Sequence, residues 1–389
     1  MKPINRLKFM PVTAILAGAA TLASAQINLY RQTTPGNTPP ILVSVTGLSA
    51  QARRILEFDL YVQGFAFTNE GAAQYLISGG SGANLQARAI DRINRRTLVA
   101  KAYSGAGLPR EVHAFADDFV EALGRKGIAQ TKIAFRHDTG PGASEVYVAD
   151  FDGYEVQGVT RDHALVDGPA WVPGRLALYY TSYRLFNPDI FYQDLVTGQR
   201  RVVAAYSGLN ASPAVSPDGR RVAMILSKAG NPDVYVCDRD GSGLKQLTFT
   251  HQDQSSPCWS PDGKWICFAG KVRGRRMLCK VPASGGPVRR IVTAGASSPS
   301  EPDWSPDGKW IAFTAQWRDF AICVVPATGG EVFVLVNGED PSWAPNSRTL
   351  VFTRRRGGRP ILSLLDVPTK QVKDVTLISG SNSQPSWAK

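Results

Sequence analysis

The sequence contains few of the residues from which catalytic and metal sites are usually built. Its 389 residues include 4 histidines and 5 cysteines, and neither a C-x-x-C nor an H-E-x-x-H spacing occurs. Zinc sites and thioredoxin-type redox sites need such clusters. The nucleophile elbow G-x-S-x-G, the Walker loop and the dinucleotide-binding fingerprint are also absent. The sequence therefore predicts no catalytic residue, no metal ligand and no cofactor, and a binding protein rather than an enzyme.

An apolar run long enough for a permanent transmembrane helix is also missing. The first 25 residues instead have the order of a secretory signal peptide, with basic residues, a short apolar run and an A-x-A cleavage site. These parts are Lys2, Arg6 and Lys8, then residues 12–22, then residues 23–25. We therefore expect residues 1–25 to be removed during export and the mature chain to have no transmembrane segment.

Acidic residues are in the minority. The chain has 44 Lys and Arg against 32 Asp and Glu, a formal net charge of +12. Without Lys2, Arg6 and Lys8 the balance is 41 against 32, or +9. A basic surface favours an acidic partner or an anionic surface, but this charge could also serve solubility alone. Nucleic acid is not expected as a partner, because the basic residues of this exported chain are not clustered with aromatics.

What the sequence does contain is a segment that recurs along its C-terminal part. Residues 256–268 read S-P-C-W-S-P-D-G-K-W-I-C-F, and close copies stand at 301–313 and 212–224. Weaker copies begin at residues 340 and 168. The first prolines of the copies, including a final fragment, are residues 169, 213, 257, 302, 341 and 385, so the steps are 44, 44, 45, 39 and 44 residues. This period with strand-like content is typical of a β-propeller, with one four-stranded blade per repeat.

Each repeat predicts short strands joined by tight turns. The proline and glycine of S-P-D-G suit turn dihedrals, so turn chemistry explains the repeated aspartates without a metal. The first blade has candidates for its second, third and fourth strands at 132–135, 145–148 and 157–160. No candidate for its first strand precedes them. The final fragment, 384–387, supplies the missing strand. The prediction is a mainly β fold, a six-bladed β-propeller over residues 129–389 that a C-terminal strand closes.

The residues before the propeller fall into two parts. Residues 26–40 are rich in Pro, Thr, Asn and Gln, and we expect a flexible tail. Its apolar residues Ile27, Leu29 and Tyr30 are candidates for docking on a partner, and a plain tail is the alternative. Residues 41–128 mix strand and helix patterns, which predicts a small α/β domain. Strands are expected at 41–45, 75–77, 85–91 and 97–103, and helices at 49–62, with Ser49 as N-cap, and at 111–124.

The loops of the propeller provide a candidate binding surface. In a propeller, the loops between blades share one face with the loops between second and third strands. Here the latter loops carry basic residues, and the blade-to-blade loops, nearer the axis, carry acidic or amide residues. These include Asn210, Gln254, Glu301, Asp340 and Gln384. This face is therefore a candidate docking surface for a protein with acidic loops.

Together these features resemble the TolB family, the periplasmic propeller proteins of the Tol–Pal envelope system. The resemblance lies in the signal peptide, the small α/β domain and the six blades with W-S-P-D-G motifs. It extends to K-I-A-F at 132–135, Y-V-A-D-F-D-G-Y at 147–154, P-A-W at 169–171, and a helix with His113 and Asp117 or Asp118. The similarity is close over residues 110–389 and looser over 41–110.

The resemblance implies binding by a periplasmic monomer. It implies docking of a Pal-like peptidoglycan-associated lipoprotein on the propeller mouth, and contact of the N-terminal tail with a TolA-like inner-membrane protein. Such a complex maintains the outer membrane during constriction at cell division. By position, the partner-binding loops are Leu209, Asn210, Ala211 and Ser212, then Gln254, Ser255 and Ser256, then Glu301 and Asp340, with Gln384 on the closing strand. The alternatives are an adaptor or sensor for another envelope partner, and an exported enzyme acting on carbohydrate or peptide.

Overall fold

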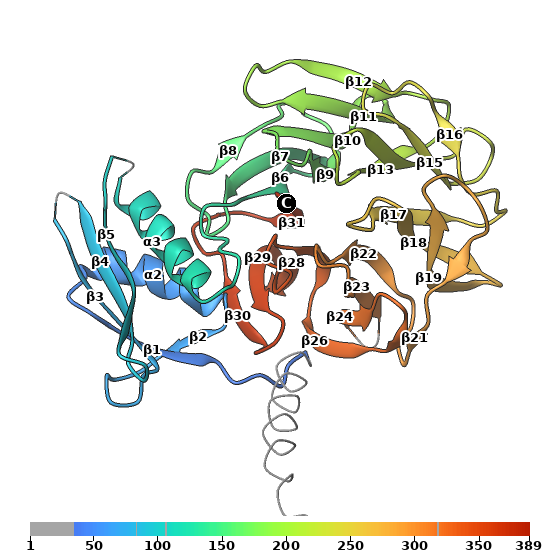
Figure 1. Ribbon diagram of the computed structural model, residues 1–389. Helices are drawn as coiled ribbons and strands as arrows, with labels where there is room; N and C mark the ends of the chain where they lie inside the picture. The colour runs from blue at the N-terminus through green and yellow to red at the C-terminus, as the bar shows by residue number, and fades with distance from the viewer. Residues whose placement is uncertain (1–34, 83, 106, 317–318) are drawn as a thin grey trace, which may run out of the picture.

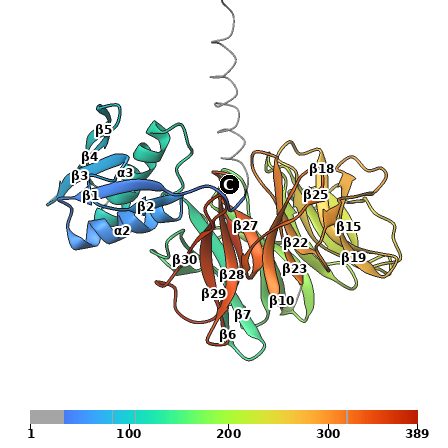
Figure 2. The same ribbon diagram turned by 90° about the horizontal axis from the view of Figure 1, so that it is seen from below.

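The protein is described by a computed structural model that covers residues 35–82, 84–105, 107–316 and 319–389 (Figure 1). The expected signal peptide and the tail residues Ile27, Leu29 and Tyr30 lie outside the described residues. A small α/β domain sits beside a ring of β-sheets (Figures 1 and 2). Within the described ranges, none of the helices combines the length and the apolar character needed to cross a membrane.

The α/β domain consists of a five-stranded sheet and two helices. The strand order is β2-β1-β3-β4-β5, and β1 is parallel to both of its neighbours. The elements are β1 Ile41–Thr46, α2 Ala50–Tyr61, β2 Phe65–Phe67, β3 Tyr75–Ser81, β4 Leu85–Asp91, β5 Arg96–Tyr103 and α3 Leu108–Ala122. Ser49 caps α2 as predicted, because its side chain accepts a hydrogen bond from the Ala52 N–H at 3.3 Å. The sequence does not predict the short strand β2, nor the early start of α3, whose first turn tolerates Pro109.

The buried face of α3 supplies much of the core of this domain. Val112, Phe115, Phe119 and Val120 are fully buried. Burying each such side chain stabilises the fold by roughly 1.5–3 kcal/mol. Phe119 meets Tyr75 of β3 edge to face, with ring centroids 5.6 Å apart. The helix and strands of the domain are thereby held as one packed unit.

The rest of the chain forms six four-stranded sheets, which are the blades of a propeller (Figure 1). We number the strands of a blade from the axis outwards. Blade 1 contains β31 Asn382–Trp387, β6 Lys132–Gly140, β7 Ala143–Asp150 and β8 Gln157–Gly158; blade 2 contains β9 Val166–Trp171, β10 Ala177–Leu185, β11 Asn187–Asp194 and β12 Arg200–Ala204; blade 3 contains β13 Asn210–Val215, β14 Arg221–Leu226, β15 Asp233–Asp238 and β16 Lys245–Gln246. The six-bladed propeller that the repeat predicts is confirmed.

The other three blades follow the same plan. Blade 4 contains β17 Gln254–Trp259, β18 Trp265–Val272, β19 Arg275–Pro282 and β20 Arg289–Arg290; blade 5 contains β22 Ser300–Trp304, β23 Trp310–Gln316, β24 Phe320–Pro326 and β26 Phe333–Asn337; blade 6 contains β27 Glu339–Trp343, β28 Thr349–Arg356, β29 Arg359–Asp366 and β30 Gln371–Asp374. One extra parallel pair, β21 Thr293–Ala294 with β25 Gly330–Glu331, links the segments after blade 4 and within blade 5.

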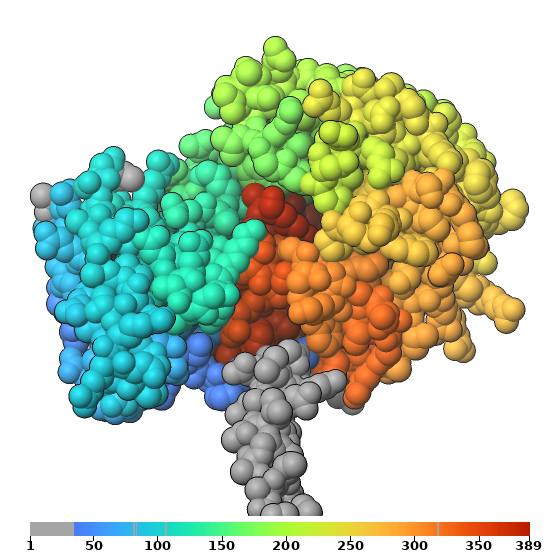
Figure 3. All heavy atoms as spheres, in the orientation of Figure 1, coloured from blue at the N-terminus to red at the C-terminus, as the bar shows by residue number. Residues whose placement is uncertain are grey.

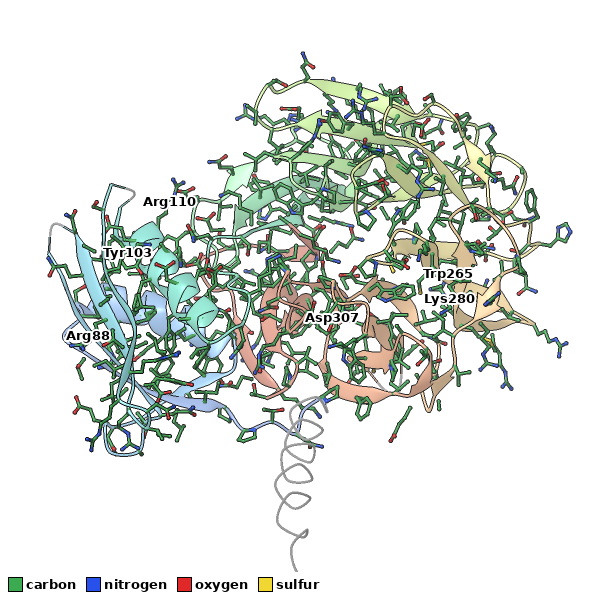
Figure 4. All side chains as sticks on the ribbon, viewed as in Figure 1. Arg88, Tyr103, Arg110, Trp265, Lys280 and Asp307 are labelled. Atoms are coloured by element: carbon green, nitrogen blue, oxygen red, sulfur yellow. The ribbon has the colours of Figure 1, made fainter. Side chains whose placement is uncertain are left out.

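The repeated S-P-D-G sequence closes the turn between the first and second strands of a blade. In blade 4, Ser260 Oγ accepts a hydrogen bond from the Trp265 N–H at 2.9 Å and donates one to Asp262 at 2.6 Å. The same bonds recur at Asp218 in blade 3 and Asp307 in blade 5 (Figure 4). The carboxylates of these repeated aspartates therefore already accept hydrogen bonds within their own turns.

The end of the chain closes the ring. Strand β31 pairs antiparallel with β6, placing Trp387 opposite Ile133. Trp387 is 1% exposed, and its ring N–H donates a hydrogen bond to Thr131 at 2.7 Å. In Figure 1 this red strand lies within a blade whose other strands are green. The pairing covers the edge of β6, which would otherwise present unpaired backbone groups.

The two faces of the propeller carry different structures. The turn face holds the turns between first and second strands and between third and fourth strands, and the hairpin face holds the hairpins between second and third strands and the blade-to-blade loops. The α/β domain contacts the turn-face ends of blade 6, where Thr349 donates to the Val62 carbonyl and Gln371 to the Phe65 carbonyl, both at 3.0 Å. The hairpin face is clear of this domain (Figure 2).

A buried ion triad joins the α/β domain to blade 1. His113 of α3 has Asp59 of α2 at 2.8 Å from Nδ1 and Asp152 of blade 1 at 3.4 Å from Nε2, and all three side chains are at most 4% exposed. The three ligand atoms lie within 4.8 Å of one another. One metal ion cannot bind both nitrogens of a ring. The arrangement instead suits an imidazolium that is hydrogen-bonded to Asp59 through Nδ1 and ion-paired with Asp152 through Nε2.

The pKa values of His113 and Asp59 are both raised above their ordinary values. Burial lowers the pKa of His113, but the two carboxylates outweigh burial and raise this pKa from 6.5 to about 10. Burial raises the pKa of Asp59 to about 7, against the lowering effect of His113. A raised histidine pKa gives stability that is complete below pH 6.5 and lost as the pH rises to about 10. The raised pKa of the buried Asp59 also costs stability, and this cost grows as the pH rises from 3.8 to about 7.

Replacing His113 should therefore destabilise the protein in a pH-dependent way. We expect His113→Gln to lower the free energy of unfolding by about 3 kcal/mol at pH 6.5, because it leaves buried carboxylates without their partner. The loss should shrink towards pH 10, where the wild-type imidazolium itself begins to lose its proton. Urea denaturation followed by tryptophan fluorescence measures both values. The exposed His251→Gln serves as control, and a loss of equal size at both pH values would contradict the triad.

Candidate functional site

The innermost strands of the six blades enclose a channel along the propeller axis. Its volume is about 470 Å³, and every blade contributes to its wall. Tryptophans and prolines of the repeat line it, including Trp171, Pro213, Trp259 and Trp304. In Figure 3 the red C-terminal residues lie at the centre of the ring. Because all six blades build this concave feature together, we take the channel as the candidate site.

A ring of residues with left-handed backbone surrounds the channel near its hairpin-face end. Each of these residues directly precedes the first proline of a repeat, and each lies at an irregularity in the pairing of the first two strands of its blade. The channel ring, with φ values, is Gly168 (57°), Ser212 (53°), Ser256 (52°), Glu301 (48°), Asp340 (55°) and Gln384 (49°). Such a conformation costs a non-glycine residue about 1 kcal/mol or more. The bulge re-aims these residues, and all six line the channel.

Buried threonines of the neighbouring blades hold this backbone in place. Three ring N–H groups donate to threonine hydroxyls of the preceding blade: Ser212 to Thr181 at 3.3 Å, Asp340 to Thr314 at 3.1 Å, and Gln384 to Thr353 at 3.1 Å. These threonines are at most 3% exposed. Each bond joins adjacent blades, so the geometry of the ring depends on the packing of the whole propeller.

The ring is chemically uneven. Its blade 2, 3 and 4 positions are glycine and serine, whereas blades 5, 6 and 1 contribute Glu301, Asp340 and Gln384. Burial, and then the nearby charge of Glu301, raise the pKa of Asp340 to about 7. Asp340 accepts hydrogen bonds from Thr353 at 3.1 Å and from the Gln384 N–H at 3.3 Å. Close to neutral pH, this side of the channel can therefore gain or lose negative charge.

The predicted partner-binding residues fall into three groups. Ser212, Ser256, Glu301, Asp340 and Gln384 line the channel together. The remaining partly exposed members, at the hairpin-face ends of β13 and β17, are Leu209, Ala211 and Ser255.

Asn210 and Gln254 have a different environment. Asn210 is fully buried, and its side chain bonds to the backbone of Tyr206 at 2.7 and 2.9 Å. Gln254 is 4% exposed and bonds to Thr248 at 2.7 Å and to Thr250 at 2.8 Å. Their amides are occupied by the fold, so the surface available to a partner consists of the other predicted residues.

The left-handed ring itself was not among the sequence predictions. The signal that could have revealed it is Gly168, because glycine in one copy of the repeat suggests a position where φ is positive. The other copies carry serine, glutamate, aspartate or glutamine there, and a residue before proline usually prefers an extended backbone.

Comparison with known proteins identifies the family of this arrangement. A family model described as the TolB beta propeller domain matches residues 120–389. The chain is 29% identical over 307 residues to the Tol-Pal system protein TolB of Bordetella pertussis, covering 77% of this chain and 70% of the relative. It is 33% identical over 184 residues to the Tol-Pal system protein TolB of Desulfosudis oleivorans, covering 45% of this chain but only 42% of that relative.

The fold also matches a solved structure. The crystal structure of TolB from Acinetobacter baumannii superimposes with a TM-score of 0.81 at 22% sequence identity, covering 92% of this chain and 98% of the other. At this identity the likeness concerns the fold, and it includes the α/β domain as well as the propeller.

The raised pKa of Asp340 leads to a stability prediction. A carboxyl whose pKa is raised on folding costs stability as the pH rises from 3.8 to about 7. We expect the Asp340→Asn variant to be more stable than the wild type at pH 8, with a free energy of unfolding about 1–3 kcal/mol larger. Near pH 4 the two free energies should differ little. Thermal and urea denaturation at both pH values test this. Asp253→Asn, at an exposed carboxyl whose pKa Lys271 lowers, should not show the gain at pH 8. An equal gain at both pH values would contradict the assignment.

Proposed function

The chain belongs to the TolB β-propeller family, and from this we propose that it is a periplasmic, monomeric scaffold of a Tol–Pal-type envelope complex. Its role is to dock a Pal-like peptidoglycan-associated lipoprotein at the propeller mouth, which maintains the outer membrane during constriction at cell division. The family match over residues 120–389 supports a role in binding rather than catalysis. The names of the relatives support membership of a Tol–Pal system.

The channel ring is the observation that supports the propeller mouth as the binding site. Ser212, Ser256 and Glu301 line the channel near a face that the α/β domain leaves clear. A partner can therefore reach the ring without displacing that domain. Keeping five non-glycine residues in a strained backbone is consistent with a functional surface.

Basic hairpins around the mouth suit an acidic partner. The side chains of Arg184, Lys271 and Arg355, on hairpins of blades 2, 4 and 6, are 52%, 44% and 66% exposed. Each lies within 4 Å of one carboxylate of this chain, but it remains open to solvent on the same face. Exposed charges of this kind mainly steer association and choose between partners.

The N-terminal tail provides a second proposed contact. Ile27 and Leu29 alternate with Gln26 and Asn28, and Tyr30 follows directly, so this short apolar stretch could add as a strand to the sheet edge of a TolA-like protein. The described part of the tail, from residue 35, lies against blade 6, where the Gly36 N–H donates to the Val367 carbonyl at 3.0 Å. This contact with blade 6 lies on the turn face, opposite the proposed mouth.

Binding at the mouth can be tested by calorimetry with a soluble Pal-like domain from the same organism. We expect the mature protein from Gln26 to bind with a Kd of about 10 μM or tighter. A variant with Ser212→Arg and Ser256→Arg should bind about tenfold or more weakly, because the two long side chains obstruct the channel ring.

The matched control adds the same two charges on the opposite face. Val196 and Ser284 are exposed residues in turns of the turn face. Changing both to arginine should leave binding unchanged. Equal loss in both variants would point to a general charge effect. If the mouth variant still binds, the proposed partner is supported but its binding site lies elsewhere. If the folded wild-type protein does not bind, the proposed partner is contradicted.

A further inference from the structure

The sheet of the α/β domain has one open edge. Strand β5 pairs with β4 on one side and with no other strand of the described chain. All of its residues are exposed or partly exposed except the last, Tyr103, which is buried. The opposite edge, β2, is covered, since Gln371 of blade 6 bonds to the Phe65 carbonyl. Figures 1 and 2 show β5 at the side of the domain away from the propeller.

The open strand is held in a fixed position. Tyr103 donates a hydrogen bond to Asp118 of α3 at 2.6 Å, and Lys101 pairs with the same carboxylate at 2.9 Å. Figure 4 shows Tyr103 beside α3 and Arg88 at the outer side of the sheet. The strand is eight residues long, which is enough to pair with a complete strand from another protein.

The sheet face next to this edge carries small residues on β3 and β5, with longer side chains on β4 between them. On the face away from the helices, Ser78 and Gly80 of β3 stand in register with Arg88 and Gln86 of β4. The same rows continue to Ala100 and Ala102 of β5. These positions border one shallow hollow. An added strand would therefore have the small side chains of Ala100 and Ala102 beside it on this face, with Arg88 one strand further in.

The charge around the edge is one-sided. Arg88, Arg92, Arg95 and Arg96 are all exposed, and no carboxylate within the described ranges forms an ion pair with any of them. The nearest acid, Asp91, is occupied by the turn, where it accepts from the Ile93 N–H and from Asn94 at 2.7–3.0 Å. Asp91 interacts electrostatically with Arg96, so it offsets part of the positive charge of the four arginines. An unpaired edge strand beside the remaining positive charge favours a negatively charged strand as its neighbour.

From these observations we propose that β5 is a docking site for an extended acidic segment of another protein, which adds to the sheet as a further strand. Backbone hydrogen bonds along Arg96–Tyr103 supply the pairing, and Arg88, Arg95 and Arg96 select negative charge. The site lies apart from the propeller channel, so the protein could hold one partner at each.

The experiment uses the full mature chain and three labelled peptides. One alternates glutamate with valine over eight residues, one alternates glutamate with proline, and one alternates lysine with valine. The first combines negative charge with strand pairing, and the third has the opposite charge. The second has the same negative charge as the first, but half of its residues lack an N–H and proline fixes φ at about −65°, which opposes a regular β-strand. We expect the glutamate–valine peptide to bind at least about tenfold more tightly than the other two in fluorescence anisotropy.

Amide hydrogen exchange then locates the bound peptide. We expect slower exchange across Arg96–Tyr103 with the glutamate–valine peptide. Charge reversal at Arg88, Arg95 and Arg96 to glutamate should weaken binding about tenfold, and the milder triple change to glutamine serves if the first variant does not fold. The control changes Arg54, Arg175 and Arg220 to glutamate, which alters the net charge equally at exposed sites elsewhere and should have little effect.

Three results would overturn the proposal. Equal binding of the glutamate–proline peptide would reduce the effect to charge alone. Protection confined to the propeller would place the peptide elsewhere. A dimer of the protein alone in sedimentation, with β5 already protected, would mean that a second copy occupies the edge. Loss of Pal-like binding at the channel ring would not affect any of these outcomes.

Discussion

The pairing of β31 with β6 is the contact on which the rest of the structure depends. It closes the ring, and the same short strand supplies parts of two other sites. Gln384 completes the channel ring, and Trp387 stacks on Phe151 near the contact with the α/β domain, with centroids 6.2 Å apart. Without this strand, blade 1 would lack its innermost strand, the channel would be open on one side, and the core cluster shared by both domains would lose Trp387.

The channel ring shows how a repeated backbone can present different chemistry. All six blades use the same left-handed residue before proline, and buried threonines fix several of them from the neighbouring blade. The side chains differ, so one half of the mouth is small and neutral and the other carries Glu301 and Asp340. A partner that docks here meets a surface with a defined orientation. The α/β domain and its triad leave this mouth clear.

Much of the architecture could be predicted because each repeat encodes its own turns and strands. Closure was predictable because one blade lacked a strand and one strand remained at the end. The left-handed ring was not, since residues before proline normally favour extended backbone. Nor was the burial of Asn210 and Gln254, because a polar residue near a loop gives no sign of its bonding partners. The triad was also hidden, because Asp59 and His113 lie 54 residues apart.

The most direct test of the docking mouth is amide hydrogen exchange of the full mature chain with and without a soluble Pal-like domain. We predict slower exchange at 209–212 and 254–256 and around Glu301, Asp340 and Gln384. The S-P-D-G turns of the opposite face should be unaffected. Protection confined to the turn face, or to the α/β domain, would contradict a docking site at the channel ring.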